Sequence, residues 1–199
     1  MNYHDIVKES MTNGDGLRAV LFVSGCTHAC PGCQNPVTWN KDGGMKFDDE
    51  AKKELFAELE KSYVSGVTFS GGDPLAIFNR DEVLDLIEEI KEKYPDKTIW
   101  VYTGYEMNEL KEQDPIFLSK LLDNIDVLVD GPYIESLRSI NNPWAGSTNQ
   151  TIRRSVNNWE PDNAPVYEFD DREGNIVDSK SCCADLGDDY DLDNTNYEL

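Results

Sequence analysis

Residues 19–33 read AVLFVSGCTHACPGC, a short apolar run followed by a turn-rich loop that contains three cysteines. The run at residues 19–23 has β-branched and aromatic members and ends at a Ser-Gly pair, which is typical of a buried strand stopped by a glycine turn. Cys26, Cys30 and Cys33 then lie within eight residues, and a proline and a glycine between the last two disfavour a helix. We therefore expect a strand whose following loop can fold around one metal centre.

The chemistry of this loop is set by its thiols, because thiolates suit zinc or iron–sulfur clusters. Zinc prefers a fourth ligand, which His28 could supply in principle. No second histidine follows at ligand spacing, so we interpret His28 as a loop residue. A four-iron cluster held by three protein thiolates would leave one iron open to an exogenous ligand.

Similar strand signals recur further along the chain, each stopped by glycine, at residues 67–69, 99–102 and 127–129. Helical patterns lie between them, beginning after Asp48, at Asn79 and at Asp114-Pro115. Asn79 and Glu82 have the spacing of a capping box. Strands that alternate with helices predict an α/β fold with parallel pairing through right-handed crossovers. The loops after the strands would then meet at one rim, where such folds bind ligands.

The loop after the second of these strands reads SGGDP, residues 70–74. Paired glycines allow a ligand to lie close to the backbone, and Asp73 could accept hydrogen bonds from an ammonium group. The loop lacks the Gly-Lys-Ser/Thr of a phosphate loop and is not a Gly-x-Gly-x-x-Gly fingerprint. Its significance depends on its expected position beside the cysteine loop.

The two loops together resemble the radical S-adenosylmethionine superfamily, and within it the activating proteins of anaerobic (class III) ribonucleoside-triphosphate reductases. The resemblance rests on Cys-x₃-Cys-x₂-Cys after the first strand and Gly-Gly-Asp after the second. It continues through IWVYTGY at 99–105, VLVDG at 127–131 and GSTNQ at 146–150, and covers about the first 154 residues. One departure is Ala145, where the family often has a basic residue.

The resemblance implies a partial (β/α) barrel of the radical S-adenosylmethionine type over residues 1–154. It implies that Cys26, Cys30 and Cys33 hold a [4Fe–4S] cluster whose fourth iron binds S-adenosylmethionine. The cofactor-binding residues that it implies lie in two segments of the chain: Gly32, Cys33 and Gln34, and Gly71, Gly72 and Asp73.

The activity implied is reductive cleavage of S-adenosylmethionine, which generates a glycyl radical on a partner, the large subunit of the anaerobic ribonucleotide reductase. No acid–base side chain is expected, because the cofactors carry the chemistry. A one-electron donor such as flavodoxin or ferredoxin is implied as a second partner. Two alternatives stay open: an activator of another glycyl-radical enzyme of the pyruvate formate-lyase type, and a zinc-binding interaction module.

Charge adds a separate constraint, since 39 acidic and 18 basic residues give a formal net charge of −21. Such a surface repels phosphate backbones and anionic bilayers, so neither nucleic acid nor membrane is an expected partner. The N-terminus lacks the pattern of a signal peptide, so we expect a cytoplasmic protein.

The end of the chain is the most acidic part, with 13 acidic and two basic residues from Glu160 onward. We expect residues 155–199 to form an acidic, poorly ordered C-terminal tail. Adjacent Cys182 and Cys183 lie in this tail, where two thiols are too few for a second cluster, and we assign them no catalytic role.

Overall fold

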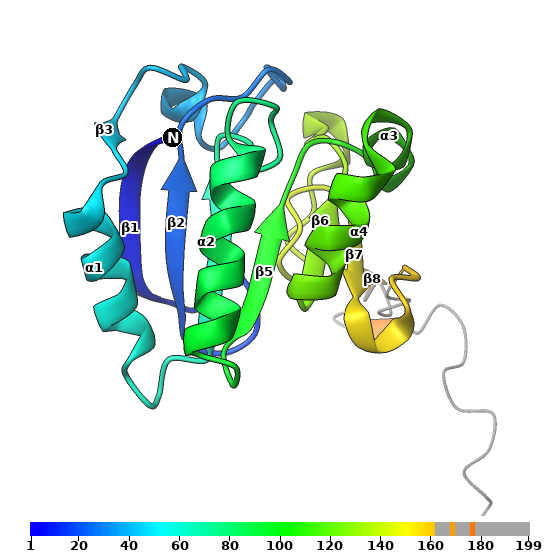
Figure 1. Ribbon diagram of the computed structural model, residues 1–199. Coiled ribbons are helices and arrows are strands. Elements are labelled where there is room, and N and C mark those ends of the chain that lie inside the picture. The colour runs from blue at the N-terminus through cyan, green and yellow to red at the C-terminus, as the bar shows by residue number, and fades with distance from the viewer. Residues whose placement is uncertain (162–167, 170–175, 178–199) are drawn as a thin grey trace, which may run out of the picture. The chain divides into compact units, whose positions relative to one another are not determined.

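The computed structural model describes residues 1–161, 168–169 and 176–177. The first of the two compact units of the chain spans Met1–Asn163, and only this unit is relevant to the site. Its described part contains a seven-stranded sheet and four α-helices (Figure 1). The strands are β1 Asn2–Ser10, β2 Arg18–Val23, β3 Met45–Lys46, β4 Gly66–Gly71, β5 Thr98–Tyr102, β6 Val127–Asp130 and β7 Thr151–Arg154. The helices are α1 Asp49–Leu59, α2 Arg80–Lys93, α3 Met107–Gln113 and α4 Pro115–Asn124.

The sheet has the order β3-β1-β2-β4-β5-β6-β7. The four central strands β2, β4, β5 and β6 pair in parallel, which confirms the strands and the pairing expected from the sequence. The outer strands β3 and β1 on one side and β7 on the other pair antiparallel to their neighbours, and the sequence patterns did not predict them. The fold is therefore a mixed α/β fold whose parallel centre brings four loops to one edge.

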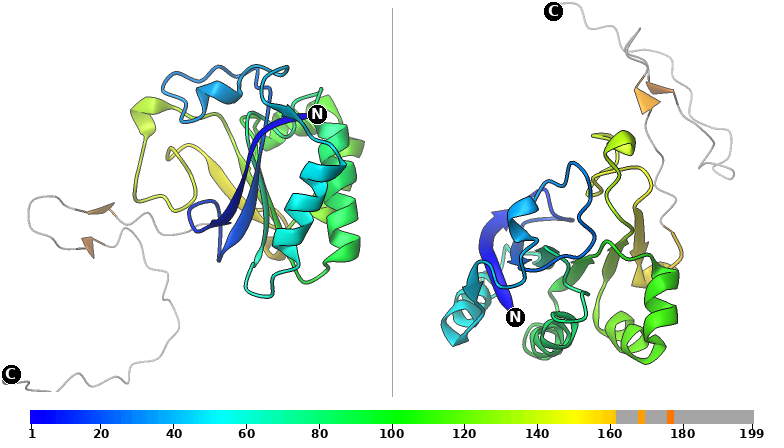
Figure 2. Two further views of the ribbon diagram at one scale, coloured as in Figure 1. Left: turned by 90° about the vertical axis from the view of Figure 1, so that its left-hand side faces the viewer. Right: turned by 90° about the horizontal axis from the view of Figure 1, so that it is seen from above.

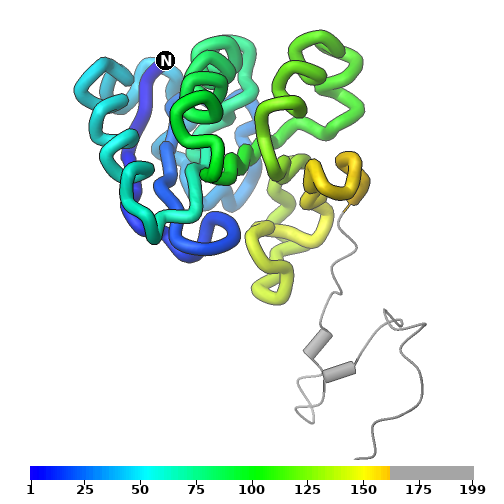
Figure 3. The backbone as a smooth tube through the Cα atoms, turned by 60° about the horizontal axis from the view of Figure 1, so that its bottom comes forward, coloured from blue at the N-terminus to red at the C-terminus, as the bar shows by residue number. Residues whose placement is uncertain are grey.

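The helices lie on the same face of the sheet, as Figures 1 and 2 show, and the tube in Figure 3 shows their close spacing from another direction. All three expected helix starts are confirmed, and two of them have a side-chain cap. Asp48 accepts hydrogen bonds from the backbone N–H groups of Glu50 and Ala51, and Asp114 accepts one from Phe117. The short helix α3 was not expected, and its capping box is formed by Glu106 and Glu109.

Each central strand is buried on both faces, because alternate side chains point to opposite sides. Ile99, Val101 and Leu128 belong to the large core beneath the helices. Trp100 and Val129 belong to a smaller cluster on the other face, together with Val127, Ala145 and Ile152. The loops on that second face enclose the site described below.

Arg18 lies at the amino end of β2, at the opposite end of the parallel strands from the glycine loops. Its side chain is fully buried and donates to the backbone carbonyls of Val67 and Thr98 and to the hydroxyls of Thr68 and Thr98. Burial lowers the pKa of this guanidinium to about 10. The hydrogen bonds compensate for its desolvation and join three neighbouring strands.

The fold continues past the expected domain boundary at residue 154. Residues Ser155–Asn157 form a 3₁₀ helix, and Trp159 packs against the main core. The Trp159 carbonyl accepts a hydrogen bond of 3.1 Å from Arg153. Further on, β8 Glu168–Phe169 pairs antiparallel with β9 Ile176–Val177. Cys182 and Cys183, and the expectation of poor order at the C-terminal end, lie outside the described residues. No helix in the described part of the chain is long and apolar enough to cross a bilayer.

Candidate functional site

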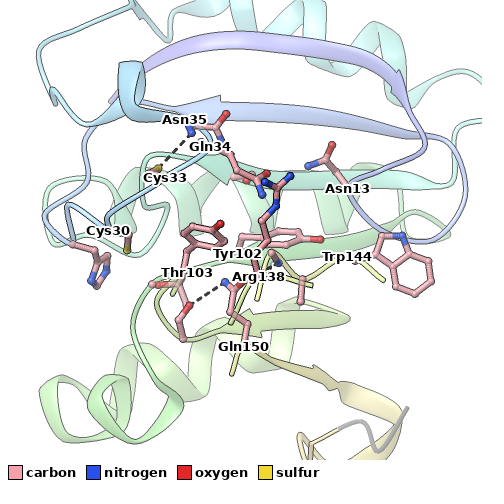
Figure 4. A pocket seen from close by; sticks show the side chains of 18 of the residues that line it. Asn13, Cys30, Cys33, Gln34, Asn35, Tyr102, Thr103, Arg138, Trp144 and Gln150 are labelled. Carbon is pink, nitrogen blue, oxygen red and sulfur yellow. Dashed lines mark hydrogen bonds between the residues drawn. The ribbon is translucent and has the colours of Figure 1, made fainter. Parts of the chain in front are cut away.

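A cavity of about 550 Å³ lies at the carboxyl ends of the parallel strands (Figure 4). It is lined by the loops after β2, β4, β5 and β6, as expected, and also by Thr12 and Asn13 from the β1–β2 connection. The cysteine loop forms one part of its wall, and Tyr102 and Trp144 form another. The parallel strands thus bring together segments that are more than 100 residues apart in the sequence.

Cys26, Cys30 and Cys33 all line this cavity as half-buried free thiols. The loop turns back on itself where the Cys33 N–H donates to the Cys30 carbonyl at 3.1 Å, and the Asn35 N–H donates to the Cys33 sulfur at 3.3 Å. Burial is the main cause that raises the pKa of the Cys26 thiol, while backbone N–H groups of the loop act in the opposite direction. A bound cation would remove this obstacle to ionisation.

The donor set fits a multi-iron cluster better than a single ion. A single zinc ion needs its ligands to converge on one point. Among the described residues, no three histidine, cysteine or acidic side chains converge in that way. Three thiols that line one cavity supply the ligand set of a cluster in which each thiolate binds a different iron.

The glycine pair of the second loop allows close packing of two backbones. A Cβ on Gly72 would lie 2.4 Å from the Gly25 carbonyl oxygen, and Gly71 has a φ of +101°. The Asp73 N–H donates to the same Gly25 carbonyl at 2.7 Å. Gly71 and Gly72 therefore line the cavity and hold the second loop against the stem of the cysteine loop.

Asp73 does not line the cavity, and its side chain is 1% exposed. Its carboxylate accepts hydrogen bonds from the Leu75 N–H at 2.8 Å and the Gly104 N–H at 3.0 Å. The Thr103 hydroxyl lies 3.0 and 3.1 Å from its two oxygens. This carboxylate therefore joins loops that follow different strands.

The fourth partner of Asp73 is His28, whose Nε2 lies 2.7 Å from Oδ2. The imidazole also packs edge-on against Tyr105 with ring centroids 4.5 Å apart. The hydrogen bond to Asp73 raises the pKa of His28, and burial opposes this shift. Sequence reasoning treated His28 as a plain loop residue, since nothing in the local pattern reveals a partner 45 positions away.

The structure gathers six of the residues expected at the site around one cavity: Cys26, Cys30, Cys33, Gln34, Gly71 and Gly72. Gly32 and Asp73 lie outside the lining. At Gly32 a Cβ would meet the side chain of Glu135 at 2.6 Å, so this glycine allows a later loop to approach.

Several lining residues were not expected at all, namely Tyr102, Tyr133, Arg138, Trp144 and Gln150. Most of them come from the long connection between β6 and β7, which has no strong periodicity. Ala145, the departure noted in the sequence, is buried in the cluster around Trp100.

Comparisons with known proteins agree with this site. A family model described as a 4Fe-4S single cluster domain matches residues 12–153. The chain is 41% identical over 156 residues to the anaerobic ribonucleoside-triphosphate reductase-activating protein of Haemophilus influenzae. The aligned region covers 77% of this chain and 98% of the relative. Proteins of the same name from Enterobacteria phage T4 and Escherichia coli K12 are 41% and 38% identical, over 76% of this chain and 93% and 97% of their own lengths.

Proposed function

The chain belongs to the family of anaerobic ribonucleoside-triphosphate reductase-activating proteins, and on this premise we propose that it generates a glycyl radical on an anaerobic ribonucleoside-triphosphate reductase through reductive cleavage of S-adenosylmethionine. The observation that carries the proposal is the gathering of three half-buried thiols and a glycine pair around one cavity at the end of a parallel sheet. The four parallel strands and the helices on one face also support a partial (β/α) barrel of the radical S-adenosylmethionine type.

In this proposal Cys26, Cys30 and Cys33 hold the [4Fe–4S] cluster. Because the three thiols line the cavity, an exogenous ligand bound in it could reach an iron that has no protein ligand. Gln34 beside the third cysteine, and Gly71 and Gly72 opposite, are the residues placed to contact S-adenosylmethionine. Gly32 and Asp73 do not line the cavity. Gly32 leaves room for the side chain of Glu135, and Asp73 accepts hydrogen bonds from neighbouring loops.

A reduced cluster held by Cys26, Cys30 and Cys33 would supply the one electron needed for reductive cleavage of S-adenosylmethionine, and this radical chemistry would remove a hydrogen atom from a glycine α-carbon of the reductase. The residues of the chain bind and orient the reactants and exclude water. The partner is then the large subunit of the reductase, and a carrier such as flavodoxin or ferredoxin supplies the electron.

The test is anaerobic reconstitution followed by electron paramagnetic resonance. Wild-type protein is expected to bind about four irons, the stoichiometry of the cluster, and to give a glycyl-radical signal with the cognate reductase, S-adenosylmethionine and a reductant. Alanine at Cys26, Cys30 or Cys33 should remove both the cluster and the signal.

Alanine at Cys182 or Cys183 is the matched control and should leave both properties intact. Equal loss in these controls would contradict the ligand assignment. Zinc without iron or sulfide in the wild-type protein would favour the interaction module.

A further inference from the structure

The carboxylate of Asp73 has no free acceptor site in this fold. An ionised carboxylate offers about four lone-pair directions. Leu75 N–H, Gly104 N–H, the Thr103 hydroxyl and His28 Nε2 supply four donors at 2.7–3.1 Å. An ammonium group of a ligand would therefore have to displace one of these donors from a site that is 1% exposed.

The four donors belong to three different loops. His28 lies in the cysteine loop after β2, Leu75 follows β4, and Thr103 with Gly104 follows β5. The backbone of the same region is tied as well, because the Asn79 amide donates to the Ser24 and Asp73 carbonyls at 2.8 and 3.0 Å. Asp73 thus sits at the junction of three loops that surround the candidate cluster.

The contact with His28 ties the segment between the first two cysteines to Asp73. His28 lies midway between Cys26 and Cys30, so a bond from its imidazole to a buried anion restrains the segment that carries both thiols. A Cβ on Gly104 would lie 2.4 Å from His28 Cδ2, so the third loop also packs directly on this ring. Charge-assisted hydrogen bonds in a buried setting are the strong ones, and they resist displacement.

We propose that His28 and Asp73 are positioning residues that lock the cysteine loop to the loops after β4 and β5, and that Asp73 does not contact the ammonium group of S-adenosylmethionine. The inference rests on the proposed function and reassigns the role that the family resemblance implied for Asp73. Recognition of the ligand then falls to other groups that line the cavity, and the contact between His28, which itself lines the cavity, and buried Asp73 holds the loops that carry these groups in place.

The experiment measures equilibrium binding of two ligands to the cluster-loaded protein. The first ligand is S-adenosylmethionine, and the second is the analogue that lacks only the α-amino group. For each variant the dissociation constant is divided by the wild-type value for the same ligand, which removes any intrinsic difference between the two. The electron paramagnetic resonance spectrum of the reduced cluster, with and without S-adenosylmethionine, is recorded in parallel.

A positioning role predicts the same loss for both ligands. Asp73→Asn and His28→Ala should each raise both dissociation constants about tenfold, the effect of one lost buried hydrogen bond. The double variant should be little worse than either single one, because both changes break one contact. His28→Gln, whose amide can still donate to Asp73, should recover most of the affinity and the wild-type spectral response.

Thr27→Val is the matched control for Thr103→Val, since Thr27 is exposed in the same loop as His28 and has no part in the contacts of Asp73. Thr27→Val should bind both ligands as wild type does, and Thr103→Val should weaken both equally. If Asp73→Asn fails to hold a cluster, the comparison of Thr103→Val with Thr27→Val decides whether the contacts of Asp73 position the loops. A direct contact between Asp73 and the ammonium group predicts no equal loss in Thr103→Val.

Two results would overturn the proposal. One is a loss in Asp73→Asn that is confined to S-adenosylmethionine and spares the analogue, which would show a direct contact. The other is wild-type binding of both ligands by His28→Ala. Failure of the proposed function looks different, because then the wild-type protein itself would bind neither ligand and its cluster signal would not respond.

Discussion

Arg138 is unusual at the level of single residues, because it brings a positive charge into the cavity of a very acidic protein. Of the described residues that line the cavity, it is the sole lysine or arginine, and none is an aspartate or glutamate. Figure 4 shows its side chain among the cavity residues, between the cysteine side of the cavity and Trp144. A cavity with this balance favours an anionic group such as the carboxylate of S-adenosylmethionine.

Arg138→Gln is therefore expected to weaken binding of S-adenosylmethionine about threefold to tenfold, a modest effect because the side chain is exposed to solvent. Arg138→Lys should keep part of the affinity, since it keeps the charge but not the planar fork. The measurement is a binding titration with S-adenosylmethionine and with its decarboxylated analogue.

Lys46→Gln, on the exposed strand β3, removes the same charge elsewhere and serves as the control. Equal losses for the two ligands in Arg138→Gln would refute a contact with the carboxylate.

At the level of elements, two helix starts with similar sequence signals behave differently. Asp48 caps α1, with Oδ1 accepting from Glu50 N at 3.1 Å and from Ala51 N at 3.0 Å. Asn79 precedes α2 and has the predicted capping-box spacing, but its side chain makes no cap hydrogen bond. It is 2% exposed and bonds to the carbonyls of Ser24 and Asp73 instead. The capping box predicted at Asn79 is wrong because tertiary contacts take its amide group.

Asp48→Ala should lower the free energy of unfolding by about 1 kcal/mol, the usual cost of losing an N-cap. Asp49→Ala is the control, because Asp49 contributes only its charge at the start of the helix, worth about 0.3–1 kcal/mol. Denaturant titration of both variants checks this expectation. A loss in Asp49→Ala as large as that in Asp48→Ala would show that charge, not the cap bonds, stabilises the start of α1.

At the scale of the whole molecule, the C-terminal boundary of the first unit decides which residues can be removed without loss of stability. Trp159 packs against the core, and Arg153 donates to its carbonyl. Ser155 N–H also donates to the Asp126 carbonyl at 3.0 Å. The segment from 155 to 161 therefore contributes to the packing of the first unit, although the sequence pattern placed it in the tail.

Two truncations test this boundary. Deletion of residues 164–199 should leave the unfolding free energy and the cluster content unchanged, because that segment is too acidic to bury much apolar surface. Deletion of residues 155–199 should lower the unfolding free energy by about 2–4 kcal/mol, through loss of a large aromatic contact. Equal stability of the two products would contradict the role of Trp159.

The same truncations, compared for glycyl-radical yield at low and high salt, test whether the acidic end affects association with the reductase. A loss of yield that is confined to low salt would indicate electrostatic steering. Loss of the cluster itself in the shorter deletion would contradict the expectation that residues 164–199 are not needed for cluster binding.

The sequence by itself determined the centre of this protein. Four apolar runs ending in glycine predicted the parallel strands, and apolar periodicity after Asp48, Asn79 and Asp114 predicted three helices, because burial periodicity is a local property. Three cysteines in one turn-rich loop predicted the candidate cluster site, since their proximity follows from chain connectivity alone. The antiparallel strands β1, β3 and β7 escaped prediction because their sequences carry no apolar run ending in glycine, and their pairing depends on strands elsewhere in the chain.

Only the tertiary structure decided what the polar side chains around the site do. Asp73 and His28 are 45 residues apart, and Asn79 and Ser24 are 55 apart, so no local pattern could pair them. A carboxylate can bind a ligand only if its lone pairs are free, and whether they are free depends on donors supplied by other loops. In this fold Asp73 accepts hydrogen bonds from three loops, and in our proposal the residues that line the cavity contact the ligand instead.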